Sequence, residues 1–260
     1  MPQGTGPIIV AGATLAAAGL GGACAWAMIH PACRAFGPVF HRAAGFVGSR
    51  YALTFDDGPT DPWTGYILDA LHDLNVPATF FTIGANVRRS GHLLRRIHQA
   101  GHIVANHSFD HAHLGMFRGG RYWHWQIRTT DELIEELIGL RPQLFRPPMG
   151  VKTPCICTAA RRLGHRIITW TRRALDGVVT EPQLILQRLV PATCPGDVLV
   201  LHDGIEPQGR RDPSATVAAI RPLVKALRDR GLEPARLYEL LCLPAYTQPT
   251  DPPSQTPSMR

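Results

Sequence analysis

Charged side chains are missing from the first 33 residues of this 260-residue chain, and lysine is scarce throughout. Of the 27 basic residues only Lys152 and Lys225 are lysines, and no basic run is interleaved with aromatic residues, so no nucleic-acid partner is predicted. The six cysteines show no C-x-x-C spacing, which leaves neither a zinc knuckle nor a disulfide framework legible. Cysteine usage therefore leaves the cellular compartment open.

The formal net charge of +7 comes almost wholly from arginine. Such a charge favours anionic partners such as phosphates, acidic lipids or acidic glycans. An arginine-rich genome would give the same composition without any such partner. With 45% hydrophobic residues, the chain is long enough to form one sizeable domain around an ordinary core.

The uncharged N-terminus contains an apolar segment at residues 8–29 that is rich in Ala and Gly. As a helix this segment would rise about 33 Å, enough to cross the hydrocarbon core of a bilayer. We therefore expect residues 1–33 to be a single-pass membrane anchor. One alternative is a secretory signal with Ala25-Trp26-Ala27 as its cleavage site, although the usual basic region is missing. The other is a buried apolar helix or a wrongly assigned chain start.

The part of the chain after this segment begins with arginines. Arg34, Arg42 and Arg50 follow the apolar segment and no basic residue precedes it, so the positive-inside rule favours the cytoplasm without settling the side of the membrane. We predict a connector at residues 34–49, a catalytic domain at 50–243 and a disordered tail at 244–260, which contains five prolines.

Short apolar runs alternate with longer amphipathic patterns after the connector. Strands are predicted at residues 51–55, 78–83, 102–105, 144–146, 166–171 and 198–201. Helices are predicted at residues 63–74, 92–100, 126–140, 153–163, 181–190 and 216–230. Because helices separate consecutive strands, the strands should run parallel in an α/β sheet or barrel.

Polar residues stand at the C-terminal ends of several predicted strands. Asp56 and Asp57 end the first strand, and His107 follows the third. Arg146 ends the fourth strand, and His202 follows directly on the last. Parallel sheets and barrels assemble their sites at this edge, so we expect these side chains to meet.

The histidines and carboxylates form a common set of metal ligands. His107 and His111 are four residues apart and would face the same way on one helical turn. With one carboxylate they suit a first-row metal, and the second carboxylate is then free to act as a base. An isolated Asp-Asp-Gly-Pro is usually a solvated turn, and an isolated His pair more often lies on the surface. The coincidence of these residues at one edge favours a metal site.

Five ordered motifs carry a resemblance to a known family. They are TFDDGP at 54–59, HSFDH at 107–111, RPPMG at 146–150, Asp176 six residues after Trp170, and LVLH at 199–202. With these motifs the chain resembles, over about residues 50–240, the polysaccharide deacetylases with a NodB-homology domain, carbohydrate esterase family four. The resemblance implies a distorted (β/α) barrel. Three positions depart from the family pattern: Met149 replaces an aromatic residue, Arg173 an Asp, and Gly177 a Trp.

The resemblance implies how the metal and the base are arranged. Asp57, His107 and His111 would bind a divalent ion, with zinc favoured and cobalt or another first-row metal as alternatives. The ion would polarise the amide carbonyl and acidify its water. Asp56 would take the proton of that water as general base, and Arg146 would hold Asp56 in position through its opposite charge.

The same resemblance implies an acid and a substrate pocket. His202 would protonate the departing sugar amine as general acid, oriented by Asp176. Pro148 and Met149 would contact the substrate, with the backbone N–H of Met149 stabilising the oxyanion. Leu199 would line the pocket for the acetyl methyl group.

These roles predict a hydrolase that removes N-linked or O-linked acetyl groups from an amino-sugar-containing polysaccharide or oligosaccharide. An alternative is a deformylase or deacetylase of a lipid-linked amino sugar, favoured by the anchor and the altered pocket. Arg172 or Arg173 would then contact a phosphate. A carbohydrate-binding pseudoenzyme that keeps the fold without turnover is a further alternative, against which stands the presence of every predicted metal ligand.

Overall fold

The computed structural model describes residues 21–45, 48–178 and 181–247. In these residues the strands are β1 (Val39–Phe40), β2 (Arg50–Asp56), β3 (Thr79–Thr82), β4 (Ile103–Asn106), β5 (Leu144–Phe145), β6 (Arg166–Ile168), β7 (Arg172–Arg173), β8 (Val198–His202) and β9 (Glu233–Ala235). Besides the helical residues 21–29, the α-helices are α2 (Trp63–Leu74), α3 (Gly84–Arg89), α4 (Gly91–Gln99), α5 (Gly120–Ile138), α6 (Pro154–Arg162), α7 (Pro182–Leu189), α8 (Ser214–Asp229) and α9 (Leu237–Leu241).

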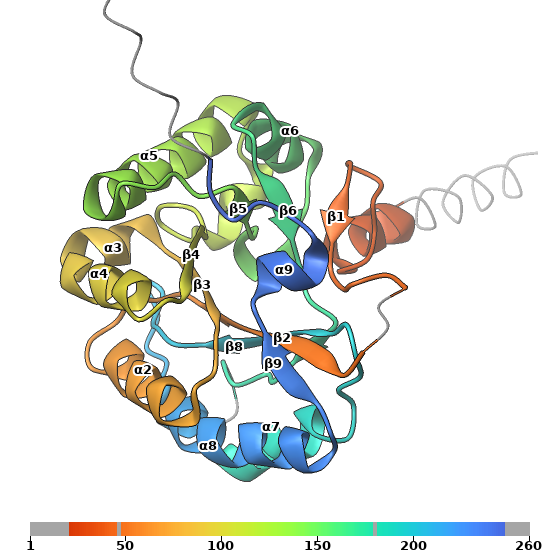
Figure 1. Cartoon of the computed structure of the whole chain (residues 1–260). Coiled ribbons are helices and arrows are strands. Elements are labelled where there is room, and N and C mark those ends of the chain that lie inside the picture. The colour runs from red at the N-terminus through yellow and green to blue at the C-terminus, as the bar shows by residue number, and fades with distance from the viewer. Residues whose placement is uncertain (1–20, 46–47, 179–180, 248–260) are drawn as a thin grey trace, which may run out of the picture.

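The described strands form one sheet in the order β1-β6-β5-β4-β3-β2-β8-β7, and β9 also pairs with β2. Their ladders are all parallel. The sheet curls into an incomplete barrel with helices packed around its outside (Figure 1). The predicted distorted (β/α) barrel is therefore confirmed.

Every predicted strand and helix has a counterpart, with ends shifted by a few residues. The largest shift is at α5, which begins at Gly120 instead of residue 126. The predicted strand at 166–171 ends at Ile168, and β7 follows as a separate element. The elements absent from the prediction are β1, β7, β9, α3 and α9, which have two to six residues each and are too short to show a hydrophobic period.

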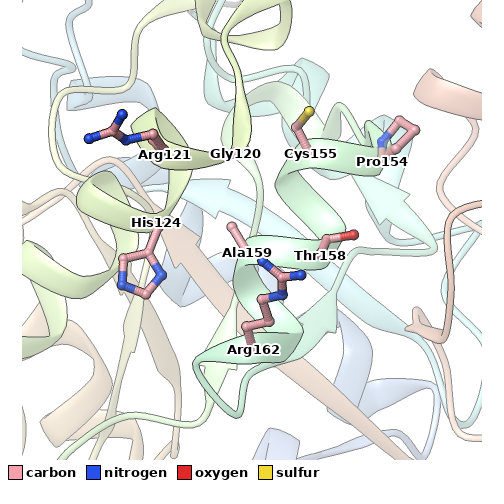
Figure 2. A pocket seen from close by; sticks show the side chains of 8 residues that line it. All are labelled: Gly120, Arg121, His124, Pro154, Cys155, Thr158, Ala159 and Arg162. Atoms are coloured by element: carbon pink, nitrogen blue, oxygen red, sulfur yellow. The ribbon is translucent and has the colours of Figure 1, made fainter.

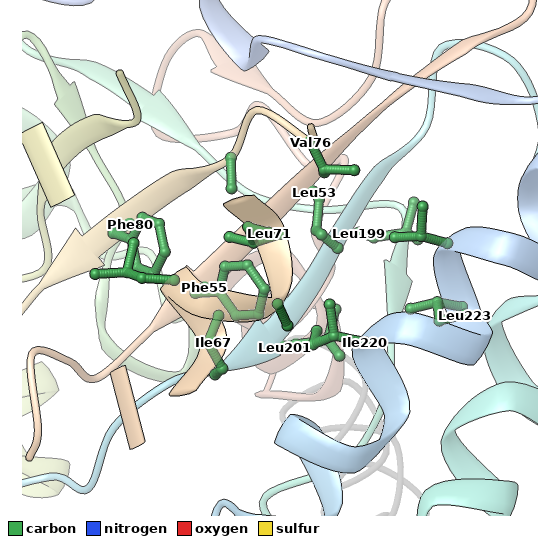
Figure 3. Close-up of a cluster of buried hydrophobic side chains, with 14 of the residues drawn as sticks. Leu53, Phe55, Ile67, Leu71, Val76, Phe80, Leu199, Leu201, Ile220 and Leu223 are labelled. Atoms are coloured by element: carbon green, nitrogen blue, oxygen red, sulfur yellow. The ribbon is translucent and has the colours of Figure 1, made fainter. Parts of the chain in front are cut away.

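Side chains of β2 alternate between two environments, because successive strand residues point to opposite faces. Leu53 and Phe55 point outward into a core that they share with Ile67 of α2 and Ile220 of α8 (Figure 3). On the opposite face, Ala52 belongs to a second cluster inside the barrel. The two faces together fix the register of β2, because a one-residue slip would exchange them.

Helix α9 packs against the beginnings of the strands. Its residues Leu237 and Leu240 lie in the inner cluster with Ala52, Ile103 and Val198, which stand at or near the starts of their strands. The N-terminal end of the barrel is therefore filled with apolar side chains. The C-terminal ends of the strands are left for the polar residues of the motifs.

The structure corrects the predicted single-pass membrane localisation. In residues 21–45, 48–178 and 181–247, no helix has the length and the apolar character needed to cross a membrane. Residues 21–29 are helical. Residues 8–20 of the predicted span lie outside the described residues. The described end of the segment is instead hydrogen-bonded to the barrel.

Two predicted domain boundaries also change. The presumed connector at 34–49 contains β1, which pairs with β6 and so belongs to the sheet. In the presumed tail at 244–260, Ala245 is buried in the inner cluster and the hydroxyl of Tyr246 accepts the Val104 N–H at 2.9 Å. Residues 248–260 lie outside the described residues. The folded domain therefore extends beyond 50–243 at both ends.

Candidate active site

The three predicted metal ligands converge: both histidines lie close to one carboxylate oxygen of Asp57. Asp57 Oδ1 lies 3.4 Å from His107 Nε2 and 3.5 Å from His111 Nε2. Asp57 Oδ1 is buried and has no hydrogen-bond partner among the described residues. The other ring nitrogens are engaged: His107 Nδ1 is 2.7 Å from the Arg146 carbonyl oxygen, and His111 Nδ1 is 2.9 Å from Glu206 Oε2. Because Nδ1 donates in each case, the Nε2 atom of each neutral imidazole has a free lone pair, which fits a metal site.

The histidine pair is not held by a helical turn, which corrects that part of the prediction. His107 directly follows β4, and His111 lies in the irregular loop beyond it with a φ of 53°. Ser108 also has a positive φ, of 68°. The loop folds back on itself and brings the two ring centroids to 5.0 Å. The two imidazoles thus converge as predicted, through a left-handed turn instead of helical spacing.

Asp56 is held by a buried arginine. Arg146 Nη1 donates to Asp56 Oδ1 at 2.6 Å and to Thr54 Oγ1 at 2.9 Å. The guanidinium lies 3.9 Å from the centre of the Phe81 ring, and burial lowers the pKa of Arg146 against the opposing charge of Asp56. Asp56 Oδ2 faces the metal ligands, 3.9 Å from the Nε2 of the first histidine. One carboxylate oxygen is therefore fixed and the other points into the site.

The partly buried His202 pairs with the buried Asp176. His202 Nδ1 lies 2.8 Å from Asp176 Oδ1, while Asp176 Oδ2 accepts the His202 N–H at 2.7 Å and the Thr216 hydroxyl at 2.8 Å. Burial disfavours the charged imidazole, but the charge and hydrogen bond of Asp176 outweigh it and raise the pKa of His202 to about 9. His202 is therefore protonated at neutral pH, as a general acid must be.

A cavity of about 350 Å³ joins these groups. Of the predicted site residues, those that line it are Asp56, Asp57, His107, His111, Met149 and His202. Arg146 and Asp176 stand behind the lining and act through Asp56 and His202. Pro148 is buried at the start of a short 3-10 turn and does not line the cavity, whereas Met149 does, with a φ of 55°.

Leu199 does not reach the cavity, which corrects its predicted place in the acetyl pocket. It is fully buried in the outer core near Ile220 and Leu223 (Figure 3). Residues two apart on a strand share a face, so Val200 and His202 of β8 point into the cavity while Leu199 points away. Val200 therefore supplies the apolar wall that was assigned to Leu199.

Backbone strain gathers at this site. Seven residues other than glycine have a positive φ in the described part of the chain. Four of them line the cavity: Asp57, His111, Met149 and Leu175. A left-handed conformation costs such residues about 1–3 kcal/mol each and is kept where the surroundings determine it. The clustering supports a functional role for the cavity independently of the motifs.

One loop contributes two residues that the sequence analysis missed. The loop between β8 and α8 carries Glu206, which holds His111, and Arg211, whose Nη1 lies 3.0 Å from Asp57 Oδ2. Glu206 also contacts the exposed His113, at 2.5 Å. The loop follows the last strand end, which is a general signal for a site. Nothing in its residue types distinguished these two from solvated loop charges.

Gly177, one of the three positions that depart from the family pattern, faces this loop. A Cβ atom added at Gly177 would lie 2.9 Å from Arg211 Nη2, so the arginine occupies the space next to the glycine. Of the two arginines considered for phosphate binding, Arg172 pairs with Asp197 at 3.0 Å and does not line the cavity. Arg173 does line it and forms no ion pair within the described residues.

A cavity away from this site lies between α5 and α6 (Figure 2). It measures about 500 Å³ and is lined in part by Arg121, His124 and Arg162. None of the predicted site residues lies in it. The predicted site residues that line a cavity therefore line the one at the strand ends, although the other cavity is larger.

Comparison with known proteins decides the family. The family model described as polysaccharide deacetylase matches residues 47–168. A chitooligosaccharide deacetylase from Sinorhizobium fredii is 33% identical over 185 residues, which make up 69% of this chain and 86% of the relative. The chain belongs to the polysaccharide deacetylase family. The family predicted from the motifs is confirmed, and with it the hydrolase class of the enzyme.

Other polysaccharide deacetylases extend the likeness. A peptidoglycan-N-acetylglucosamine deacetylase from Bacillus cereus is 32% identical over 180 residues, which span 69% of this chain but only 64% of the relative. The crystal structure of a peptidoglycan N-acetylglucosamine deacetylase superposes with a TM-score of 0.74 at 26% identity, and covers 80% of this chain and 95% of that one. The barrel is thus the fold of this family.

Proposed function

We propose that this protein is a metal-dependent deacetylase that removes N-linked acetyl groups from a glycan containing N-acetylglucosamine. The observation that carries the proposal is that Asp57 Oδ1 and two histidine Nε2 atoms converge in one cavity. The same cavity is lined by Asp56, which Arg146 fixes, and by His202, which is protonated at neutral pH. The substrates in the names of the relatives, peptidoglycan and chitooligosaccharide, share this acetylated amino sugar.

The metal would be held by Asp57, His107 and His111, with zinc favoured because the ligands are one oxygen and two imidazole nitrogens. At these residues a bound divalent ion would provide a Lewis acid next to the amide carbonyl oxygen. Cobalt or another first-row ion is the alternative. Glu206 keeps His111 in the orientation that turns its Nε2 toward Asp57.

The protein side chains divide the proton transfers. Asp56 Oδ2 takes a proton from the attacking water while its Oδ1 stays bound to Arg146. Attack on the amide carbon breaks the carbonyl π bond and gives a tetrahedral oxyanion, for which the backbone N–H of Met149 is the proposed donor. His202 then gives its proton to the amide nitrogen as the C–N bond breaks, so acetate and a free amine leave. Asp176 stabilises the imidazolium before that step.

A lipid-linked amino sugar is a second candidate substrate. One observation favours it: Arg173 and Arg211 both line the cavity, and two guanidinium groups suit a phosphate. On such a substrate Arg173→Ala should lower kcat/KM, with little effect on a neutral glycan. Arg172→Ala is the matched control on the same strand, because its side chain lies outside the cavity. An equal effect of Arg173→Ala on both substrates would remove this candidate.

The proposed function is tested by measuring acetate and formate released from N-acylated glycans and lipid-linked amino sugars, with and without added metal. We expect acetate from N-acetylglucosamine oligomers, and loss of turnover after chelation. Asp56→Asn separates an enzyme from a carbohydrate-binding pseudoenzyme, because removing the base should lower turnover strongly in an enzyme while glycan binding is preserved. Absence of acetate release from every glycan, with metal bound, would refute the proposal.

A further inference from the structure

A further cavity, different from the one between α5 and α6, adjoins the active-site cavity next to residues 26–31. It measures about 500 Å³, within the range of about 300–1,000 Å³ that is usual for ligand sites. The two cavities share Met149, Trp170 and Arg173. The rest of the further cavity is lined by Trp26, Ile29, His30, Pro31 and Thr171. We call it the N-terminal cavity, since its outer wall comes from the segment at 26–31.

This segment is fixed to the barrel beside the RPPMG motif. The backbone N–H of Lys152 donates to the Met28 carbonyl at 2.9 Å, and its Nζ donates to the His30 carbonyl at 2.9 Å. The Thr169 hydroxyl donates to the Pro31 carbonyl, also at 2.9 Å. Lys152 is 1% exposed, and a buried ammonium needs such bonds to offset its desolvation. Carbonyls at the end of a helix carry partial negative charge and suit it.

The wall of the N-terminal cavity offers an aromatic face. The rings of Trp26 and His30 stack at 4.6 Å between centroids with 24° between their planes. Trp26 is 57% exposed and Met149 is 42% exposed, although both are large apolar side chains. An exposed aromatic ring attracts C–H groups to its electron-rich face, and one face of a pyranose ring consists of C–H groups. His30 and Arg173 add polar groups for hydroxyls.

We propose that the N-terminal cavity binds sugar units adjacent to the one that is deacetylated, with Trp26 as the stacking platform. The proposal rests on the proposed deacetylase function and names its substrate class as an acetylated glycan of several sugars. Continuity through Met149 and Trp170 gives a single chain access to both cavities. An acyl chain is a less suitable occupant, because Arg173 and His30 stand in the same wall.

The test is the dependence of kcat/KM on oligomer length, measured with N-acetylglucosamine oligomers from the dimer to the hexamer. In the wild type kcat/KM should rise with length. Trp26→Ala should lower the ratio of the hexamer to the dimer value by about 3- to 10-fold, as expected for one aromatic stacking contact. Trp26→Phe should restore most of the ratio. Trp125→Ala is the matched control, since Trp125 is similarly exposed, at 50%, and lines neither cavity.

A binding measurement separates this inference from the proposed function. Hexamer binding to metal-loaded Asp56→Asn protein should weaken by a similar factor when Trp26→Ala is added, whether or not turnover occurs. If acetate is released but the length ratio of Trp26→Ala equals that of the wild type, the inference is wrong and the function stands. A loss confined to a substrate that carries an acyl chain would also overturn it, in favour of an acyl-binding cavity.

Discussion

The pair of His202 and Asp176 yields a prediction whose size follows from the structure. Asp176→Asn keeps the shape of the side chain and removes its negative charge. The pKa of His202 is about 9, against an ordinary value of 6.5. At 1.36 kcal/mol per unit, this rise of about 2.5 units corresponds to about 3 kcal/mol. Without that charge, burial and Arg211 still lower the pKa of His202 and Asp57 still raises it, so we expect His202 in the variant to titrate near its ordinary value of 6.5.

A general acid is active only while it holds its proton, so activity should fall as the pH rises through its pKa. The wild type should lose activity above about pH 9, and the Asp176→Asn variant above about pH 6.5. At pH 8 the protonated fraction of His202 should drop from about 0.9 to about 0.03, a loss of about 30-fold from protonation alone. The measurement is kcat/KM for an N-acetylglucosamine oligomer across this pH range, because kcat/KM reports the groups of the free enzyme.

Thr216→Val is the control for this experiment. It removes the hydrogen bond from the Thr216 hydroxyl to Asp176 Oδ2 and leaves the charge of the carboxylate in place. Its alkaline limb should stay near that of the wild type. An alkaline limb that does not move in Asp176→Asn, while the variant remains folded and active, would refute the role of Asp176 in setting the protonation of His202.

Three further predictions concern the metal ligands and the pocket. Asp56→Asn should keep its metal and lower kcat by about 10²–10⁴-fold, whereas Asp57→Asn should lose metal first; equal metal loss in both, by elemental analysis, would contradict the division of roles. Glu206→Gln should weaken metal binding by about 10–100-fold in competition with a chromogenic chelator, and an unchanged affinity would deny Glu206 an orienting role. Gly177→Trp should destabilise the protein by about 1–3 kcal/mol in denaturant unfolding, because Arg211 fills that space, and adding Arg211→Ala should recover part of the loss.

Local sequence patterns were enough to predict the main elements of the barrel and the residues at its strand ends. A helix such as α2 shows its apolar face within 12 residues, and its predicted bounds equal the observed ones. Asp56, His107 and His202 were predicted together because parallel strands end at the same edge. Such inferences need only local periodicity and the order of elements along the chain.

The tertiary structure decided which partners these residues have. Arg211 reaches Asp57 from 154 positions away, and no spacing rule covers such a distance. Which residues of β8 line the cavity depends on which face of the strand is turned inward. Val200 lies on that face and lines the cavity, whereas Leu199 lies on the other face, in the core. The N-terminal segment is apolar enough to suggest a membrane anchor, but its described end is hydrogen-bonded to Lys152. Apolar composition indicates only that a segment is more stable when removed from water. Which part of the protein packs against that segment depends on the fold of the whole chain.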